Sequence, residues 1–124
     1  MSHLEVVAHM KVRPGQLEGF KSHVAEMVRL ARERDTRTLR YDWFIDEKTM
    51  ECEVHEIYLD EQGLMEHNRN IMGARERLFK EAADDHRMAV YGEISPELAS
   101  LFDRHAGGVS RFSFLGGLAA TPKV

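Results

Sequence analysis

The spacing of apolar and polar residues changes within the first 34 positions of the chain. From His3 to Val12 apolar and polar side chains alternate, and valine also occurs on the second face, so we expect a strand with both faces at least partly covered. Positions 16–34 follow a helical period instead, with one apolar stripe: Leu17, Phe20, Val24, Met27, Val28 and Ala31. Pro14 and Gly15 stop the strand and allow the helix to begin.

Residues 39–58 alternate on both sides of a polar segment at 46–49, which predicts a β-hairpin. If those four residues form the turn, Ile45 pairs with Met50. Counting outward then places Leu39 opposite Glu56. One face is apolar and aromatic apart from a single carboxylate: Leu39, Tyr41, Trp43, Ile45, Met50, Cys52, Val54, Glu56 and Tyr58. A lone acid on such a face is the strongest functional clue in the sequence.

A second helical period follows the hairpin. Asp60 is a plausible N-cap, and we expect the helical region to end near Asp85, with Gly73 indicating a break into two helices because glycine is unfavourable in a helix interior. The order continues with a strand at 86–94, a short helix at 95–104 and an extended segment at 109–115.

This βαββαβ order predicts an α+β, ferredoxin-like subunit. We expect residues 1–95 to form that core and residues 96–124 to form a C-terminal helix-strand extension. Helices of one subunit cover only one sheet face, yet the first strand and the hairpin carry apolar residues on both. We therefore expect a homodimer in which the free faces meet as a dimeric α+β barrel, with Phe112 and Phe114 of the extension reaching across the interface.

Composition narrows the possible partners. A chain of 124 residues supports one domain, and its formal charge of −4 argues against nucleic acid as the main ligand. The single cysteine, Cys52, rules out an internal disulfide. No apolar run approaches the roughly 20 residues that span a bilayer, and the N-terminal residues do not resemble a secretory signal. We expect a cytoplasmic protein with no membrane partner.

Three short motifs occur in the order seen in one known family. They are the Arg-Pro-Gly start of the first helix within residues 12–20, the Leu-Arg-Tyr sequence at 39–41, and residues 54–60 followed by Leu64 and His67. With these motifs the chain resembles the antibiotic biosynthesis monooxygenase family of the dimeric α+β barrel superfamily over roughly residues 4–94. It departs from the family where a Gly-Cys pair often precedes the second strand, because residues 36–38 here are Thr-Arg-Thr, and in its C-terminal extension.

The resemblance implies several activities rather than one. Some members oxidise quinols or aromatic polyketides with dioxygen and without metal or flavin, relatives degrade haem, and many have no demonstrated activity. The favoured hypothesis is a cofactor-independent monooxygenase acting on a phenolic, quinol or polyketide-like small molecule. The alternative is a non-catalytic dimeric module that binds a small aromatic or apolar molecule or has only a structural role.

Glu56 and His67 are the candidate catalytic residues. A buried carboxylate has its pKa raised by desolvation and lowered by a nearby imidazolium, and such pairs are candidates for proton transfer. His67 could be the base and Glu56 its orienting partner, although the two could equally satisfy each other without any catalytic role. The candidate substrate-binding residues are Tyr41, Trp43, Tyr58, Asn68 and Met72, whose alternative role is packing.

Cofactor motifs are lacking in the sequence. The seven histidines do not form a pair with metal-ligand spacing, and the two Gly-Gly pairs at 107–108 and 116–117 lack the spacing of a phosphate loop. We therefore expect no metal and no cofactor, with haem held by His67 as a weaker alternative. An open cavity beside Glu56 and His67, large enough for an aromatic ring, would distinguish the catalytic or ligand-binding hypotheses from a purely structural role.

Overall fold

The computed structural model describes residues 3–105 and 108–119 of the chain. In these residues the helices and strands follow one another in the order β1 (Leu4–Val12), α1 (Leu17–Arg34), β2 (Thr38–Asp46), β3 (Glu51–Tyr58), α2 (Glu61–Glu81), β4 (Ala83–Tyr91), α3 (Pro96–Asp103) and β5 (Val109–Phe112). The strands form one sheet in the order β2-β3-β1-β4-β5, in which only the β4–β5 pair is parallel. The predicted α+β, ferredoxin-like fold is therefore confirmed, with β5 added at the edge of the sheet next to β4.

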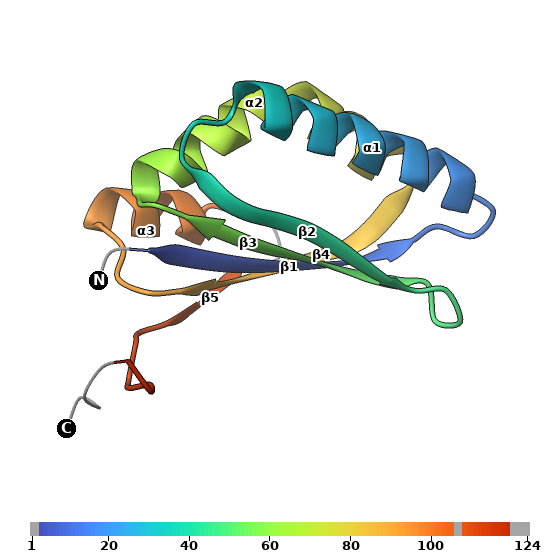
Figure 1. Ribbon diagram of the computed structural model, residues 1–124. Coiled ribbons are helices and arrows are strands. Elements are labelled where there is room, and N and C mark those ends of the chain that lie inside the picture. Colours follow the sequence, from blue (N-terminus) through green and yellow to red (C-terminus); the bar gives the residue numbers. More distant parts are fainter. Residues whose placement is uncertain (1–2, 106–107, 120–124) are drawn as a thin grey trace.

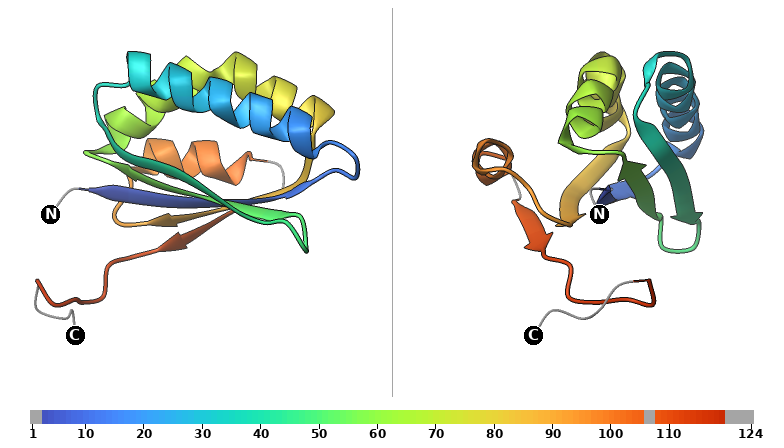
Figure 2. Two further views of the ribbon diagram at one scale, coloured as in Figure 1. Left: turned by 45° about the vertical axis from the view of Figure 1, so that its right-hand side comes forward. Right: turned by 60° about the vertical axis from the view of Figure 1, so that its left-hand side comes forward.

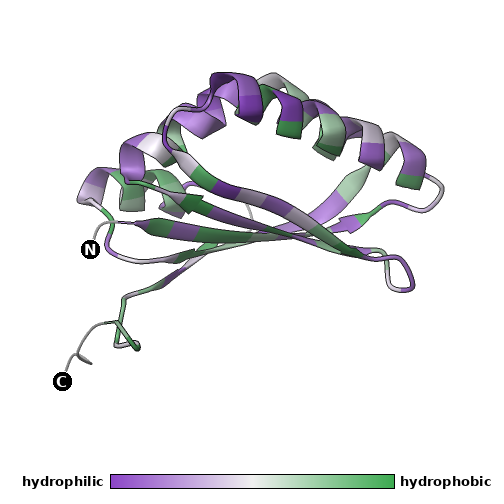
Figure 3. Cartoon of the chain, viewed as in Figure 1, coloured by the Kyte–Doolittle hydropathy of each residue, from purple (hydrophilic) through white to green (hydrophobic). Residues whose placement is uncertain are grey.

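All three helices lie on one side of the sheet (Figures 1 and 2). Alternate residues of β1 point into this layer and are buried, as the predicted alternation requires. Colouring by hydropathy shows hydrophilic residues on the outer surfaces of α1 and α2, which is the amphipathic arrangement expected of surface helices (Figure 3). Leu98 and Phe102 of α3 pack with Leu4, Val6 and Tyr58 in a second core cluster, separate from the main cluster beneath α1 and α2.

The hairpin turn lies one residue further along the chain than predicted. The pairing joins Asp46 to Glu51 and Tyr41 to Glu56, so the turn consists of residues 47–50. Met50 belongs to the turn because its φ of 63° lies in the left-handed region and its N–H donates to the Asp46 carbonyl at 2.8 Å. The predicted register was wrong by two residues, which leaves the paired side chains from Arg40 to Asp46 on their predicted faces because strand side chains alternate with a period of two.

Leu39 does not belong to the apolar face. A bulge between Thr38 and Arg40 adds one unpaired residue to β2, and the side chain of Leu39 is 54% exposed. The prediction that it lies opposite Glu56 was wrong, because a bulge cannot be detected from alternation alone.

The second helical region is one continuous helix. The predicted cap is confirmed, since the Asp60 side chain accepts a hydrogen bond from the Gly63 N–H at 3.0 Å. Gly73 does not break α2. It lies on the exposed side of the helix, while Ala74 and Leu78 on the buried side hold the helix against the core. The fourth strand begins at Ala83 rather than at His86.

The two glycines of α2 are expected to respond in opposite ways to substitution by alanine. A Cβ at Gly63 would lie 2.8 Å from the Arg37 carbonyl oxygen, so Gly63→Ala should lower the free energy of unfolding by about 1–3 kcal/mol. At Gly73 the nearest atom is the flexible end of Arg77 at 3.5 Å, so Gly73→Ala should raise it by about 0.5–1 kcal/mol. Urea unfolding of both variants would measure this difference, and a stabilising Gly63→Ala would contradict the close packing described at this position.

No described helix covers the sheet face opposite α1–α3, and only the segment after β5 lies near one end of this face (Figure 1). Val7, His55, Ile57 and Ala89 on this face are half-buried, whereas Phe44, Tyr91 and Phe112 are exposed.

No helix in the described part of the chain is long and apolar enough to cross a bilayer.

Candidate functional site

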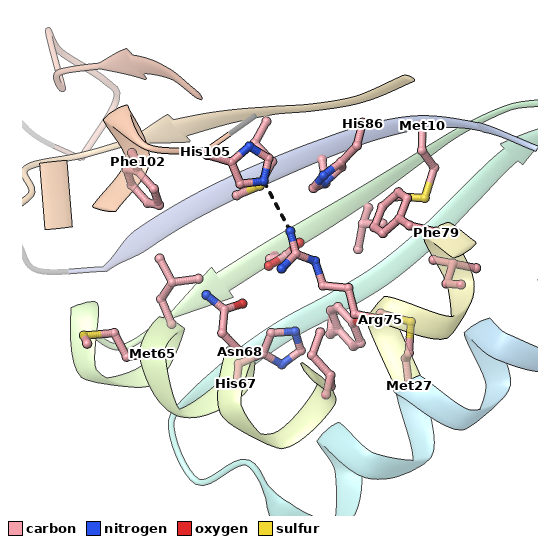
Figure 4. A pocket seen from close by; sticks show the side chains of 18 of the residues that line it. Met10, Met27, Met65, His67, Asn68, Arg75, Phe79, His86, Phe102 and His105 are labelled. Carbon is pink, nitrogen blue, oxygen red and sulfur yellow. Dashed lines mark hydrogen bonds between the residues drawn. The ribbon is translucent and has the colours of Figure 1, made fainter. Parts of the chain in front are cut away.

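A cavity of about 250 Å³ lies between the sheet and the helices. Most of its wall is apolar, with methionine, leucine and phenylalanine side chains from the sheet, α2 and α3. Its polar lining consists of Tyr41, Glu56, His67, Asn68, Arg75, His86 and His105, several of which are labelled in Figure 4. A cavity thus lies beside Glu56 and His67, the feature named above as distinguishing a catalytic or ligand-binding site from a purely structural role.

Five of the seven predicted site residues line this cavity: Tyr41, Trp43, Glu56, His67 and Asn68. Tyr58 does not, because it is fully buried in the second core cluster, where its hydroxyl donates a hydrogen bond to Glu56 Oε1. Met72 does not either: it follows Ile71 on α2 but points away from the core and is 53% exposed. A contact of either residue with a ligand in the cavity is thus not supported by the structure.

The hydrogen-bond partner of His67 is Asp35 rather than Glu56. His67 Nδ1 lies 2.7 Å from Asp35 Oδ2, and the two side chains are 1% and 3% exposed. Asp35 also accepts hydrogen bonds from Asn70 Nδ2 at 2.8 Å and Thr38 Oγ1 at 2.7 Å. The predicted orienting role of Glu56 was wrong, because the end of α1 brings a different carboxylate to the imidazole.

This contact determines which nitrogen of His67 can react. Burial raises the pKa of Asp35, but the hydrogen bonds from His67, Asn70 and Thr38 together lower it by more than burial raises it. The pKa of Asp35 therefore lies below the usual value, and the side chain is ionised at neutral pH. A carboxylate at Nδ1 favours the tautomer with the proton on Nδ1. The lone pair of Nε2 is then left on the opposite edge of a ring that lines the cavity.

The α1–β2 connection, residues 35–37, is tied to α2 at each of its three residues. Besides the Asp35 contacts, the Thr36 N–H and hydroxyl both donate to Glu66 at 2.8 Å. The Arg37 guanidinium pairs with Asp60 at 2.7 Å. These contacts fix the position of the carboxylate relative to the helix that carries His67.

Glu56 is buried beside the histidine without being hydrogen-bonded to it. Burial raises its pKa, and the opposing effects of His67, the Tyr58 hydroxyl and Arg75 do not reverse this increase. Tyr41 of β2 is paired with Glu56 on the neighbouring strand β3. Its ring packs edge-on against the His67 ring, with 4.4 Å between the ring centroids. Burial and the charge of Glu56 raise the pKa of Tyr41, so its hydroxyl remains protonated and can donate a hydrogen bond.

The Glu56→Gln substitution is expected to reduce the pH dependence of stability. The pKa of Glu56 in the folded protein lies above its unfolded value of about 4.3, so the wild type loses stability as the pH rises from the lower to the higher value. Glutamine can still accept the Tyr58 hydrogen bond but does not titrate. In urea unfolding between pH 4 and pH 8, the stability of Glu56→Gln relative to wild type should therefore increase with pH. Glu53→Gln, at an exposed position of the same strand, is the control, and an identical slope in both variants would contradict the prediction.

Sequence reasoning missed four polar residues of the site: Asp35, Arg75, His86 and His105. Arg75 Nη2 lies 3.4 Å from His105 Nε2, and the rings of His86 and His105 are 5.2 Å apart (Figure 4). Burial, Arg75 and His105 lower the pKa of His86 to about 4, so this imidazole is uncharged at neutral pH. The only sequence signal for Arg75 is its position two helical turns after His67; the histidines come from β4 and from the segment after α3 and carry no local signal.

The described residues contain no group of three or more His, Cys, Asp or Glu side chains that could hold a metal ion.

The fold defines a class with solved members. No protein-family model matches the chain, and no curated protein matches it. Among solved structures, a protein from Caulobacter crescentus named a putative antibiotic biosynthesis monooxygenase has a TM-score of 0.67 at 16% identity, covering 76% of this chain and 92% of its own. The chain has the α+β fold of proteins so named.

MupZ from Pseudomonas fluorescens matches more of the chain. Its TM-score is 0.79 at 22% identity, and the match covers 95% of this chain and 94% of MupZ. Rv0793 from Mycobacterium tuberculosis has a TM-score of 0.65 at 18% identity and covers 76% of this chain and 97% of its own. Since the match leaves only 5% of this chain uncovered, the likeness to MupZ includes most of the C-terminal segment.

Proposed function

We propose that this protein is a cofactor-independent monooxygenase that oxidises a phenolic, quinol or polyketide-like small molecule with dioxygen. The observation that carries the proposal is the Asp35–His67 pair beside an apolar cavity: the carboxylate holds Nδ1 of a ring that lines this cavity, which leaves Nε2 to accept a proton. A histidine held in this way is suited to act as a general base. The names of several proteins with the same fold agree with the proposal.

The cavity is compatible with an aromatic substrate. An apolar cavity of about 150 Å³ is enough to bind benzene, so the volume of about 250 Å³ has room for a substituted ring. Trp43 and the methionines offer apolar contacts, while the Tyr41 hydroxyl and the Asn68 amide offer hydrogen bonds to a substrate oxygen.

The reaction begins with loss of a proton from the substrate to His67 Nε2. The resulting electron-rich anion gives one electron to dioxygen, and the substrate radical and superoxide combine to form a C–O bond. The peroxide anion then takes a proton, and loss of water converts a CH₂ group of the substrate to C=O. One dioxygen is consumed and one water is released, so the substrate itself supplies the electrons and no cofactor is required.

The experiment is to incubate the purified protein with hydroquinones, naphthols and anthrones under ¹⁸O₂. We expect uptake of one dioxygen per product and one labelled oxygen atom in each product. Binding of these compounds without any oxygen uptake would instead favour the non-catalytic binding module.

We also propose a homodimer that buries the uncovered face of the sheet. The half-buried Val7, His55, Ile57 and Ala89 and the exposed Phe44 on that face support it. Sedimentation of a monomer at micromolar concentration would contradict the dimer.

A further inference from the structure

Arg75 places a positive charge inside the cavity, at a distance from His67. The two residues lie on the same side of α2 and are separated by eight positions, which corresponds to about 12 Å along the helix axis. Figure 4 shows the Arg75 side chain extending from α2 toward His105 on the other side of the cavity. The backbone positions of His67 and Arg75 are thus about two helical turns apart, and both side chains line the cavity.

The charge of Arg75 is not neutralised by an ion pair with any described carboxylate. Its contacts are His105 Nε2 at 3.4 Å and the ring of Phe79 at 5.9 Å from the guanidinium carbon. Arg29 and Arg37 show the usual arrangement, since they pair with carboxylates at 2.6 and 2.7 Å. A partly buried guanidinium among apolar side chains is ordinarily paired.

His86 and His105 lie next to Arg75 and bring no negative charge to it. They can supply ring N–H groups as hydrogen-bond donors. Since Nε2 of His105 faces a guanidinium N–H, it acts as the acceptor, and the ring proton is on Nδ1. That buried Nδ1 has no hydrogen-bond partner among the described residues. His86 lies beside this ring and is uncharged at neutral pH, because burial lowers its pKa to about 4.

Glu56 is the acidic residue that faces this group from the sheet. It affects Arg75 only through space, with no ion pair between them among the described residues, and its Oε1 is occupied by the Tyr58 hydroxyl. The Arg75 guanidinium is therefore not held by this carboxylate, although burial raises the pKa of Glu56.

We propose that Arg75, together with His105, binds the carboxylate of an acidic small molecule whose apolar body extends through the cavity toward His67. A single guanidinium matches the two oxygens of a carboxylate through parallel hydrogen bonds. One cation beside neutral imidazoles and apolar walls suits an organic monoanion better than a phosphate dianion. The assignment of His67 to the reacting end of this molecule rests on the proposed function, whereas the binding of the acid does not.

The test is calorimetric titration with 2-naphthoate and with its uncharged counterpart 2-naphthamide. Wild type should bind the carboxylate about 10- to 100-fold more tightly than the amide. Arg75→Gln should remove this preference, and Arg75→Lys should retain only part of it because the planar fork is lost. Arg77→Gln, at an exposed position of the same helix, is the matched control and should behave like wild type. Circular dichroism would confirm that each variant is folded.

The proposal is overturned if wild type binds both compounds equally, binds neither at millimolar concentration, or keeps its preference in Arg75→Gln. Displacement of naphthoate by an equal concentration of inorganic phosphate would overturn the choice of a carboxylate. The same titration with His67→Ala separates this inference from the proposed function. A preserved carboxylate preference there, whatever the oxygen uptake, supports the acid-binding site, and its loss overturns the assignment to Arg75.

Discussion

Replacing His67 by alanine is expected to lower kcat for dioxygen-dependent oxidation by about 10²–10⁴-fold. Among the described residues, His67 is the one cavity-lining histidine that is hydrogen-bonded to a carboxylate, with 2.7 Å between Nδ1 and Asp35. Because proton abstraction precedes the reaction with dioxygen, a slower abstraction should limit the overall rate of turnover and of oxygen uptake to the same extent. Substrate binding should change less, since the walls of the cavity remain.

Oxygen-electrode measurements on wild type and His67→Ala, with a substrate found in the ¹⁸O₂ experiment, would test this prediction. His23→Ala is a matched control, because His23 also contacts a carboxylate, Glu81 at 3.1 Å, but lies outside the cavity. Partial rescue of His67→Ala by added imidazole would further identify the lost group as a base. Equal kcat values for wild type and a folded His67→Ala would refute the catalytic role.

Replacing Asp35 by alanine is expected to lower the free energy of unfolding by about 2–4 kcal/mol. The substitution leaves His67 Nδ1 and Asn70 Nδ2 without the acceptor that they share, at a site where the His67 side chain is almost fully buried. It also removes the acceptor for the Thr38 hydroxyl at the start of β2. Three elements, α1, β2 and α2, therefore lose a common anchoring point.

Urea unfolding would measure the loss, with Asp42→Ala as the control. Asp42 also pairs with a basic residue, Arg40 at 2.8 Å, but on an exposed surface, so its removal should change stability by only about 0.5 kcal/mol. The pKa of Asp35 is lowered in the folded protein, so the stabilisation by its charge is fully present above about pH 3.9 and is lost as the pH falls toward the folded value. A loss no larger than that of Asp42→Ala would contradict the anchoring role.

The fold could be predicted because its main signals are local. Alternation in β1, the helical stripe of α1 and the cap at Asp60 are each decided by residues close together in the sequence, and all agree with the structure. The hairpin register depended on whether Met50 belongs to the turn, which is decided by a left-handed backbone conformation that a methionine seldom adopts. The parallel pairing of β5 with β4 depends on how α3 packs and has no local signal.

The candidate site was predictable only in part. Glu56, Tyr41 and Trp43 follow from the face pattern of the hairpin, and His67 follows from the buried stripe of α2. Asp35 could not be found in this way, because it lies 32 residues from His67 and reaches it only through the path of the chain at the end of α1. The sequence therefore singled out a histidine that lines the cavity, but assigned it the wrong carboxylate.

The ties between the α1–β2 connection and α2 determine where the chain can change in length. Each of residues 35–37 contacts a different side chain of α2 or its cap, so one inserted residue there would displace Asp35 from His67. The turn at 47–50 lies at the tip of a ribbon that projects from the sheet, and none of its residues lines the cavity (Figure 1). A labelling peptide or a fused domain is therefore best inserted at the hairpin tip, where the geometry of the proposed base would be unaffected.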